Sequence, residues 1–434
     1  MIPEIGLVAL AGEYEVGFSD TPALLQRAAA SLRGCGFKVA AAPEVMHDSE
    51  SVKKDAEALS RESFDVLCVC VGTWSEDHHL LDLMEYFDKP VILWAFPAVE
   101  TGSLCGVQQI CCVLKELDKT YFYVYGEPDS TQVLREIGEI SRAVALKNRL
   151  RHVKIGTIGG RVKGMTEVAF DELEIKERTG VRIVNLDEEE LTAAYDHAIE
   201  SKAAERWEQL RREAGKVTST QAHGVEALRY YLAMKALIAE YGLEGIVVKC
   251  YPRYMGKICL GYSLLSEEGY VCGCEGDVNS TVLMKILREL TGKPIHNTDL
   301  LYPDEELNTI LFSHCGSGGF SIAADAQSIH LAPVRLAESG VCARFPAKTG
   351  AVTLANLVGR RGTMRMSVGS GESVACGMEF PGNPLKIQFA AKVGELNRRI
   401  AYEGIGHHWM CGYGDVTREL EHFCRLCGIK LIQL

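Results

Sequence analysis

The chain has 434 residues, of which 47% are hydrophobic and 24% are charged, and its formal net charge is −12. This composition is typical of a folded globular protein, and the length predicts two or three domains of roughly 100–200 residues each. The acidic balance argues against a nucleic-acid partner, because phosphate backbones select a basic surface. No apolar run approaches the roughly 18–20 residues that span a bilayer, and no basic secretory leader is visible, so we expect a cytoplasmic protein without membrane contact.

Sixteen cysteines are scattered along the chain, many of them in apolar runs such as VLCVCVG, which contains Cys68 and Cys70. This placement favours buried thiols in a reducing compartment over disulfides. Cys424 and Cys427 form a C-x-x-C pair, but the surrounding sequence predicts a helix followed by a strand, with no second pair at zinc-finger spacing. We therefore expect these two thiols to pack in the core.

The first predicted domain, residues 1–150, alternates apolar strand-like runs with helical stretches. Continuous apolar runs between helices are typical of a parallel sheet covered on both faces, here of the flavodoxin or Rossmann type. Glu13 and Glu15 follow the first strand where a dinucleotide-binding loop would have glycines, so no dinucleotide site is expected. The predicted strands are IGLVAL, FKVAAAP, FDVLCVCVGTW, DKPVILWAFP and KTYFYVYGE.

The second predicted domain, residues 151–300, repeats the α/β pattern with strands at HVKIGTIGG, VRIVNLD and EGIVVKCYP. One long charged helix is predicted over about 187–215, and another helix is predicted to end at Gly242. The glycines of IGTIGGRVKGM lack the spacing of a phosphate-binding loop, so we interpret them as a turn. The third predicted domain, residues 301–434, contains short strands separated by Gly, Pro and Asn, which indicates a β-rich antiparallel sheet or small barrel.

Candidate metal ligands gather in the second half of the sequence. Each of them alone has a structural interpretation; Glu275 and Asp277, for example, precede a helix that they could simply cap. Together they form an oxygen and nitrogen donor set suited to Mn²⁺ or another divalent cation. His78 and His79, in WSEDHHLLDL, are instead expected on a helix surface. The candidates lie at predicted strand ends or among glycines: Glu275, Asp299, His314, His407 and His408.

The run CEGDVNSTVLMKILRELTGKPIHNTDL, followed by FSHCGSGG and GIGHHWMCGYGD, resembles the L-fucose/L-arabinose isomerase superfamily and is most similar to its shorter fucose isomerase-like members. The likeness covers the whole chain in outline. It is most specific in the spacing from Glu275 to Asp299, in the HCG at 314–316 and in the HH pair at 407–408. Two departures, a shorter chain and Asp299 in place of the glutamate of the arabinose type, favour the fucose type and leave the sugar open.

The resemblance implies that Glu275 and Asp299 are both metal ligands and the acid–base pair. It further implies that one histidine of the 407–408 pair is a ligand, with His408 favoured, and that His314 is a fourth. Such a site would interconvert an open-chain aldose and ketose through a cis-enediol while the cation holds O1 and O2. A homotrimer or homohexamer is also implied, with SLCGVQ (103–108) lining the site of a neighbouring subunit.

Two other functions are compatible with the same residues. A metal-dependent lyase or epimerase would use the same ligands, and a non-catalytic sugar-binding or regulatory protein could form its cleft from two flavodoxin-like domains. A pure binder, however, has no need of carboxylates and histidines in four separate loops. The C-terminal arginines Arg344, Arg360, Arg361 and Arg365 could meet an anionic substrate, although solvated positions on strands are the simpler interpretation.

Overall fold

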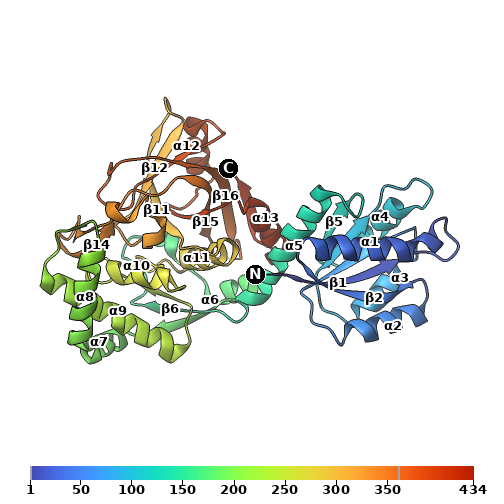
Figure 1. The fold of residues 1–434 in the computed structure, drawn as a ribbon, viewed down its shortest axis with the longest axis horizontal. Coiled ribbons are helices and arrows are strands. Elements are labelled where there is room, and N and C mark those ends of the chain that lie inside the picture. Colours follow the sequence, from blue (N-terminus) through green and yellow to red (C-terminus); the bar gives the residue numbers. More distant parts are fainter. Residues whose placement is uncertain (1, 360–361) are drawn as a thin grey trace. The chain divides into compact units, whose positions relative to one another are not determined.

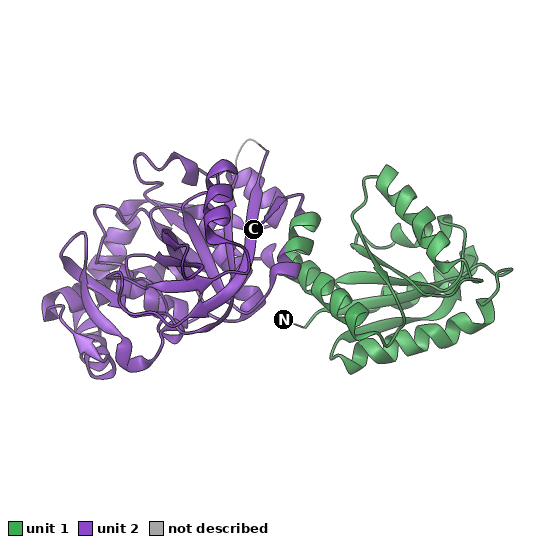
Figure 2. Cartoon of the chain, turned by 90° about the horizontal axis from the view of Figure 1, so that it is seen from above, with its two compact units in different colours: residues 1–148, 421–426 green, residues 149–420, 427–434 purple. Residues whose placement is uncertain are grey.

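The computed structural model describes residues 2–359 and 362–434, which divide into two compact units (Figure 2). Unit 1 contains the chain up to residue 148 together with residues 421–426. Unit 2 contains residues 149–420 and 427–434.

Unit 1 is a parallel five-stranded sheet with helices on both faces (Figure 1). The strand order β2-β1-β3-β4-β5 is the flavodoxin-like order. Alternate residues of β1 enter different hydrophobic clusters: Leu7 packs with α1 and α5, and Val8 packs with α2, α3 and α4. The strands are β1 (Glu4–Leu10), β2 (Lys38–Met46), β3 (Val66–Val71), β4 (Val91–Ala95) and β5 (Tyr121–Tyr125); the helices are α1 (Thr21–Gly34), α2 (Ser49–Leu59), α3 (His78–Met84), α4 (Ser103–Glu116) and α5 (Thr131–Leu150).

Unit 2 begins with a second parallel sheet, in which four strands follow the order β10-β9-β6-β7. The single helix predicted over about 187–215 is wrong, because Ala198 and Ile199 adopt extended conformations and separate α7 from α8. Helix α9 ends as predicted at Gly242, which adopts a left-handed conformation. The elements are β6 (Lys154–Ile158), α6 (Glu172–Thr179), β7 (Arg182–Leu186), α7 (Glu188–His197), α8 (Glu200–Glu213), α9 (Gln221–Tyr241), β9 (Gly245–Val248), α10 (Cys259–Glu267), β10 (Val271–Gly273) and α11 (Val278–Thr291).

A β-rich region completes unit 2 (Figure 1). Six strands pair antiparallel in the order β15-β18-β11-β12-β17-β16, and β16 pairs back to β15, so the sheet closes on itself. Strand β19 joins β16 in parallel, and a small sheet contains β14, β13 and β8. The elements are β8 (Lys216–Val217), β11 (His296–Asp304), β12 (Thr309–Ser313), β13 (His330–Val334), β14 (Ser339–Arg344), β15 (Gly350–Val358), β16 (Arg365–Val374), β17 (Leu385–Gln388), α12 (Val393–Tyr402), β18 (His408–Tyr413), α13 (Thr417–Cys427) and β19 (Lys430–Gln433).

One hydrophobic cluster joins the second parallel sheet to the β-rich region. It contains Ile158 and Ile246 from the parallel sheet and Phe312 and Trp409 from the closed sheet. The predicted fold class, two parallel α/β sheets followed by a mostly antiparallel β-rich sheet, is confirmed. The domain boundaries at 150 and 300 stay predictions.

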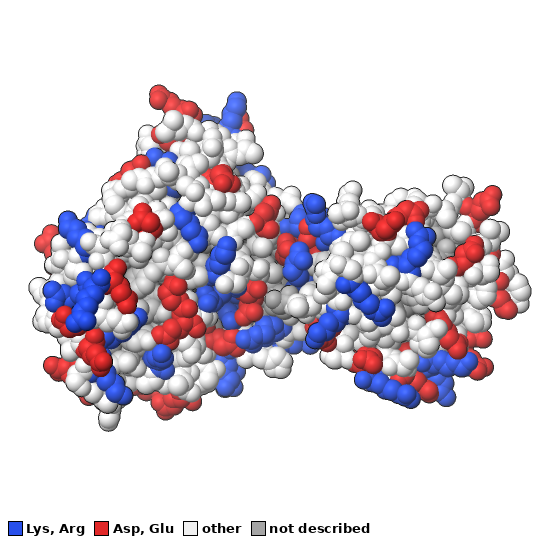
Figure 3. Space-filling model, in the orientation of Figure 1, with Lys and Arg blue, Asp and Glu red and all other residues white. Residues whose placement is uncertain are grey.

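All sixteen cysteines lie within the described residues, and none of them forms a disulfide there. Cys424 and Cys427 are both buried on α13, as expected of core residues. On the face drawn in Figure 3, acidic and basic side chains are interspersed rather than gathered into one basic patch. Among the helices of the described chain, none combines the length and apolar character needed to cross a membrane.

Candidate active site

Four of the residues selected from the sequence converge in unit 2. Glu275 follows β10, and His314 directly follows β12, both as predicted. Asp299 was expected after a strand end but lies within β11, where it pairs with His408 on β18 and with Ser313 on β12. His408 was expected in a loop, but it begins β18 and is buried. Cross-strand register therefore brings Asp299 and His408 together.

Glu275 occupies an unusual backbone conformation at the carboxyl end of the second parallel sheet. Its φ is +61° and that of Gly276 is +76°, so two successive residues are left-handed. Only glycine fits at 276, because a Cβ there would lie 2.0 Å from the carbonyl oxygen of Gly160. The Val162 N–H donates to the Glu275 carbonyl oxygen at 3.3 Å. The glycine-rich segment after β6 therefore supports the turn that presents Glu275.

His408 lies between two carboxylates. Its Nδ1 is 2.7 Å from Oδ2 of Asp277, and its Nε2 is 2.8 Å from Oε2 of Glu275. Burial would lower the pKa of the imidazole, but the hydrogen bonds with Asp277 and Glu275 outweigh it and raise the pKa to about 10. Without a bound cation, this ring is therefore protonated at neutral pH.

The charges around Glu275 keep its carboxyl group ionised. Burial raises its pKa, but the neighbouring His314 ring and the hydrogen bond from His408 outweigh this effect and lower the pKa to about 2. His314 Nε2 lies 3.9 Å from both Glu275 Oε2 and Asp299 Oδ2. Burial also opposes protonation of His314, but the charge of Asp299 helps to raise the pKa of this ring well above its ordinary value.

The sequence predicted Asp277 at a helix start but did not identify its contact with His408. The helix start was expected correctly, and Oδ1 of Asp277 accepts the Ser280 N–H at 3.0 Å as the N-cap of α11. Its Oδ2 accepts from the Ser280 hydroxyl at 2.6 Å and also contacts His408. A carboxylate behind a histidine fixes the tautomer and orientation of the ring. No local sequence signal links Asp277 to a histidine 131 positions away.

The donor set fits a divalent cation. One candidate ligand atom each from Glu275, His314 and His408 lies within 4.8 Å of the others, and the same holds for Asp299, His407 and His408. Oδ1 of Asp299 is buried without a hydrogen-bond partner, although a buried polar atom normally has one. Carboxylate and imidazole donors together suit Mn²⁺ and similar ions. The group of Glu275, Asp299, His314 and His408 is therefore the candidate metal site.

His407 has a different environment from His408. Its ring lies against that of His408, tilted by 39° with centroids 3.9 Å apart, but its Nδ1 lies 2.7 Å from Oε1 of Glu167. The His407 side chain is 40% exposed, whereas that of His408 is 2% exposed. The geometry therefore favours His408 over His407 as the ligand.

A pocket within unit 2 opens onto the candidate metal site. Glu275, Asp299 and His314 line it together with Arg335 and Phe380. The Arg335 guanidinium lies 5.1 Å from the centre of the Phe380 ring. A small polar molecule in this pocket would reach both carboxylates and one histidine of the site.

The other residues selected from the sequence lie elsewhere. Arg344 hydrogen-bonds to the carbonyl oxygen of Pro333, and Arg365 donates to that of Gly404 at 2.7 Å. Arg360 and Arg361 lie outside the described residues. The segment 103–108 begins α4 in unit 1, and its place at a neighbouring subunit's site stays a prediction.

The expectation for His79 is wrong. Its side chain is buried rather than on a helix surface, and its Nε2 lies 3.3 Å from Oε2 of Glu76. Glu76, His78 and His79 form a further group of possible ligands in unit 1, but Glu76 and His78 are exposed.

The fold and this donor set define a protein with a candidate divalent-metal site between a parallel α/β sheet and a closed β-sheet. No protein-family model matches the chain. The chain is 23% identical to a sulfoquinovose isomerase from Priestia aryabhattai over 413 residues, which cover 92% of each chain. It is 25% identical to one from Alkalicoccus urumqiensis over 379 residues, 83% of this chain and 84% of the relative.

An L-arabinose isomerase from Flavobacterium johnsoniae is 22% identical over 348 residues, which cover 76% of this chain and 69% of that protein. These relatives are all sugar isomerases. The chain is a distant homologue of these proteins, so the resemblance to the fucose/arabinose isomerase-like superfamily that the sequence suggested is confirmed.

Proposed function

We propose that the protein is a metal-dependent isomerase that interconverts an open-chain aldose and ketose. The observation that carries this proposal is the convergence of Glu275, Asp299, His314 and His408 beside one pocket. Homology to sugar isomerases supports the same reaction class. The finer points, namely the metal, the acid–base roles and the sugar, rest on the chemistry of these side chains.

Glu275, Asp299, His314 and His408 would hold the cation. When bound, a divalent cation such as Mn²⁺ supplies Lewis-acid polarisation of the two sugar oxygens next to the reacting carbons. His408 is oriented for a ligand role, because a proton on Nδ1 donates to Asp277 and leaves the Nε2 lone pair free. Asp299 Oδ1 is a further donor without a protein partner.

The two carboxylates would move the protons. Glu275 accepts the proton from C2 of the aldose, and Asp299 takes part in returning a proton to C1. In the first half of the reaction O1 gains a proton as C2 loses one, which gives an enediol. In the second half the O2 hydroxyl loses its proton as C1 gains one, so no co-reactant is consumed. General acid–base catalysis of this kind is typically worth about 10²–10⁴-fold in rate.

The decisive experiment combines metal removal with solvent exchange. Chelator-treated protein is incubated with a panel of aldoses and ketoses in D₂O, with and without Mn²⁺, and deuterium at C1 and C2 is measured. We expect metal-dependent exchange with at least one sugar and a loss of about 10²–10⁴-fold in Glu275→Gln. Glu403→Gln, an exposed position in the same unit, is the matched control and should behave as wild type.

Two outcomes would contradict the proposal in different ways. Tight metal binding without deuterium exchange in any sugar would exclude the isomerase function and favour a lyase, an epimerase or a sugar-binding protein. Absence of metal binding would make the four residues structural.

We further propose that the substrate is an anionic sugar. Several relatives are named sulfoquinovose isomerases, and sulfoquinovose carries a sulfonate. Arg335 is the only Lys or Arg that lines the pocket in the described part of the chain, and no carboxylate of residues 2–359 or 362–434 pairs with it. A guanidinium at the pocket rim matches the planar oxygen array of a sulfonate or carboxylate.

Replacement of Arg335 tests this specificity. In Arg335→Met we expect KM for an anionic sugar to rise about tenfold or more, because one charge-assisted hydrogen bond is worth about 1.5–3 kcal/mol. The kinetics of a neutral sugar should not change, and Arg335→Lys should retain part of the preference. An equal rise in KM for neutral and anionic sugars would show that Arg335 does not recognise the negative charge of the sugar.

A further inference from the structure

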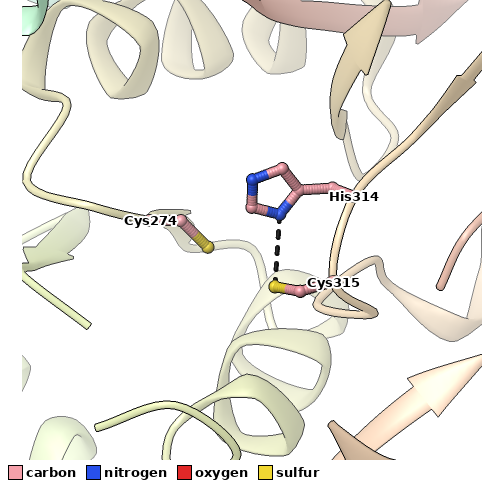
Figure 4. Close-up of side chains that lie close together, drawn as sticks. All are labelled: Cys274, His314 and Cys315. Atoms are coloured by element: carbon pink, nitrogen blue, oxygen red, sulfur yellow. Dashed lines mark hydrogen bonds between the residues drawn. The ribbon is translucent and has the colours of Figure 1, made fainter. Parts of the chain in front are cut away.

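A group of thiols lies on the opposite side of the His314 ring from the candidate metal site. Whereas Nε2 of His314 faces Glu275 and Asp299, its Nδ1 lies 3.2 Å from the sulfur of Cys315. Figure 4 shows the side chain of Cys274 directed toward the same ring and toward Cys315. One ligand atom each from Cys274, His314 and Cys315 lies within 4.8 Å of the other two.

Two more thiols extend this group. The Cys250 sulfur accepts the N–H of Glu275, the neighbour of Cys274, at 3.4 Å, and Cys315 packs against the cluster that contains Cys259. Cys250, Cys259 and Cys274 are buried. Cys250, Cys259 and Cys315 also line the pocket that opens onto the candidate metal site. A small cation that enters this pocket therefore meets three thiols as well as the carboxylates of Glu275 and Asp299.

We propose that Cys274, Cys315 and Nδ1 of His314 form a second metal site, selective for a soft ion such as Zn²⁺, Cd²⁺ or Cu⁺. Thiolate and imidazole ligands select these ions, whereas carboxylates select harder ones. A tetrahedral zinc ion with bonds of about 2.0–2.3 Å holds its ligands roughly 3.5–3.8 Å apart, which the present spacing allows after small side-chain rotations. Cys250, Cys259 or water would supply the fourth ligand.

Charge balance supports a buried site of this kind. Binding of one divalent ion leaves both sulfurs and Nδ1 of His314 without protons, so two thiolates neutralise the ion, the neutral ring adds no charge and no net charge remains buried. A divalent ion would bind to a proton-free Nδ1, whereas the candidate site on the other side of the ring uses Nε2. Because the two sites share one ring, occupation of the sulfur site weakens the hold of His314 on the other cation.

The test does not depend on sugar chemistry. Apoprotein kept under a non-thiol reductant without oxygen is titrated with Cd²⁺, and the ultraviolet absorption of the cadmium–thiolate bond is followed. We expect about one sulfur-bound ion per chain at this site, and the corresponding absorption should be lost in Cys274→Ser/Cys315→Ser. Cys68→Ser, which changes a buried thiol in unit 1, is the matched control and should leave the absorption intact.

Two further variants separate this proposal from the proposed function. Glu275→Gln and Asp299→Asn should keep the cadmium–thiolate absorption, because neither residue belongs to the sulfur site. Equal absorption in wild type and the double cysteine variant would overturn the proposal, as would loss of the absorption in Glu275→Gln. Circular dichroism of each variant establishes that the chain is folded. The test of the sulfur site is therefore independent of whether the protein isomerises a sugar.

Discussion

Each unit contains a carboxyl group that is at least partly buried, and the two groups differ in ionisation. In unit 1, Asp55 on α2 accepts the Glu44 N–H at 3.2 Å, while its other oxygen has no hydrogen-bond partner. Burial raises the pKa of Asp55 to about 7. In unit 2, Glu275 is partly buried, but its pKa is lowered to about 2 because the neighbouring His314 ring and the hydrogen bond from His408 outweigh desolvation.

The difference shows what is needed to keep an acid ionised away from water. Desolvation alone favours the neutral form of a carboxyl group, and nearby positive charge reverses the balance. The parallel sheets of the two units have related strand orders, but the second one meets a β-rich region that contributes His314 and His408. The same arrangement that charges these histidines in the metal-free protein would accept a cation in place of their protons.

The largest expected effect is a pH dependence of stability that differs between the units of the metal-free protein. The pKa of His408 is raised from 6.5 to about 10, so its contribution to unit 2 is fully present below pH 6.5 and is lost as the pH rises through about 10. The expected loss is on the order of 5 kcal/mol. Glu275, whose pKa is lowered from 4.5 to about 2, loses its contribution only as the pH falls from 4.5 through about 2.

Native-state hydrogen exchange, read peptide by peptide, measures both units in one sample. Peptides of 149–420 should lose protection between pH 6.5 and 10, once the intrinsic pH dependence of exchange is corrected. Mn²⁺ should reduce this loss, because the cation replaces the protons of the histidines. Constant stability of unit 2 over this range would contradict a charged His408.

A smaller effect is expected when the carboxylate behind His408 is neutralised. Asp277→Asn keeps a good N-cap residue for α11, so the fold should persist. The variant loses the negative charge that orients and polarises His408, and such changes typically cost about 10–100-fold in metal affinity. Titration calorimetry with Mn²⁺ measures the change.

Asp171→Asn is the matched control, because Asp171 also caps a helix of unit 2, α6, through its side chain. Its metal affinity should equal that of wild type. If both variants bind Mn²⁺ as tightly as wild type, Asp277 does no more than cap its helix.

The sequence predicted the elements better than the contacts between them. Continuous apolar runs identified the parallel strands, because strands buried on both faces must be apolar throughout. The position of Glu275 after β10 was also accessible, because the acid lies between a short apolar run and a helix start. The pairing of Asp299 with His408 depends on the register of strands more than 100 residues apart, which no local pattern encodes. Burial of His79 likewise depends on neighbours distant in the sequence.

The smallest expected effect concerns the isolated acid of unit 1. Because burial raises the folded-state pKa of Asp55 from 3.8 to about 7, wild-type stability falls as the pH rises from 3.8 through about 7 and then levels off. Asp55→Asn cannot ionise, so its stability relative to wild type should increase over that range. The gain at pH 8 should be only about 1 kcal/mol, because the new amide group lies where Oδ2 has no partner.

Hydrogen exchange of unit 1 peptides at pH 4 and pH 8 measures this gain. The control is Asp48→Asn at the N-cap of the same helix, where hydrogen bonds from Ser51 lower the pKa of the carboxyl group. That variant should gain nothing on going to pH 8, because the wild-type charge at Asp48 is stabilising. Equal responses of the two variants would mean that burial does not set the ionisation of Asp55. The contrast with Glu275 would then need a cause other than the histidines.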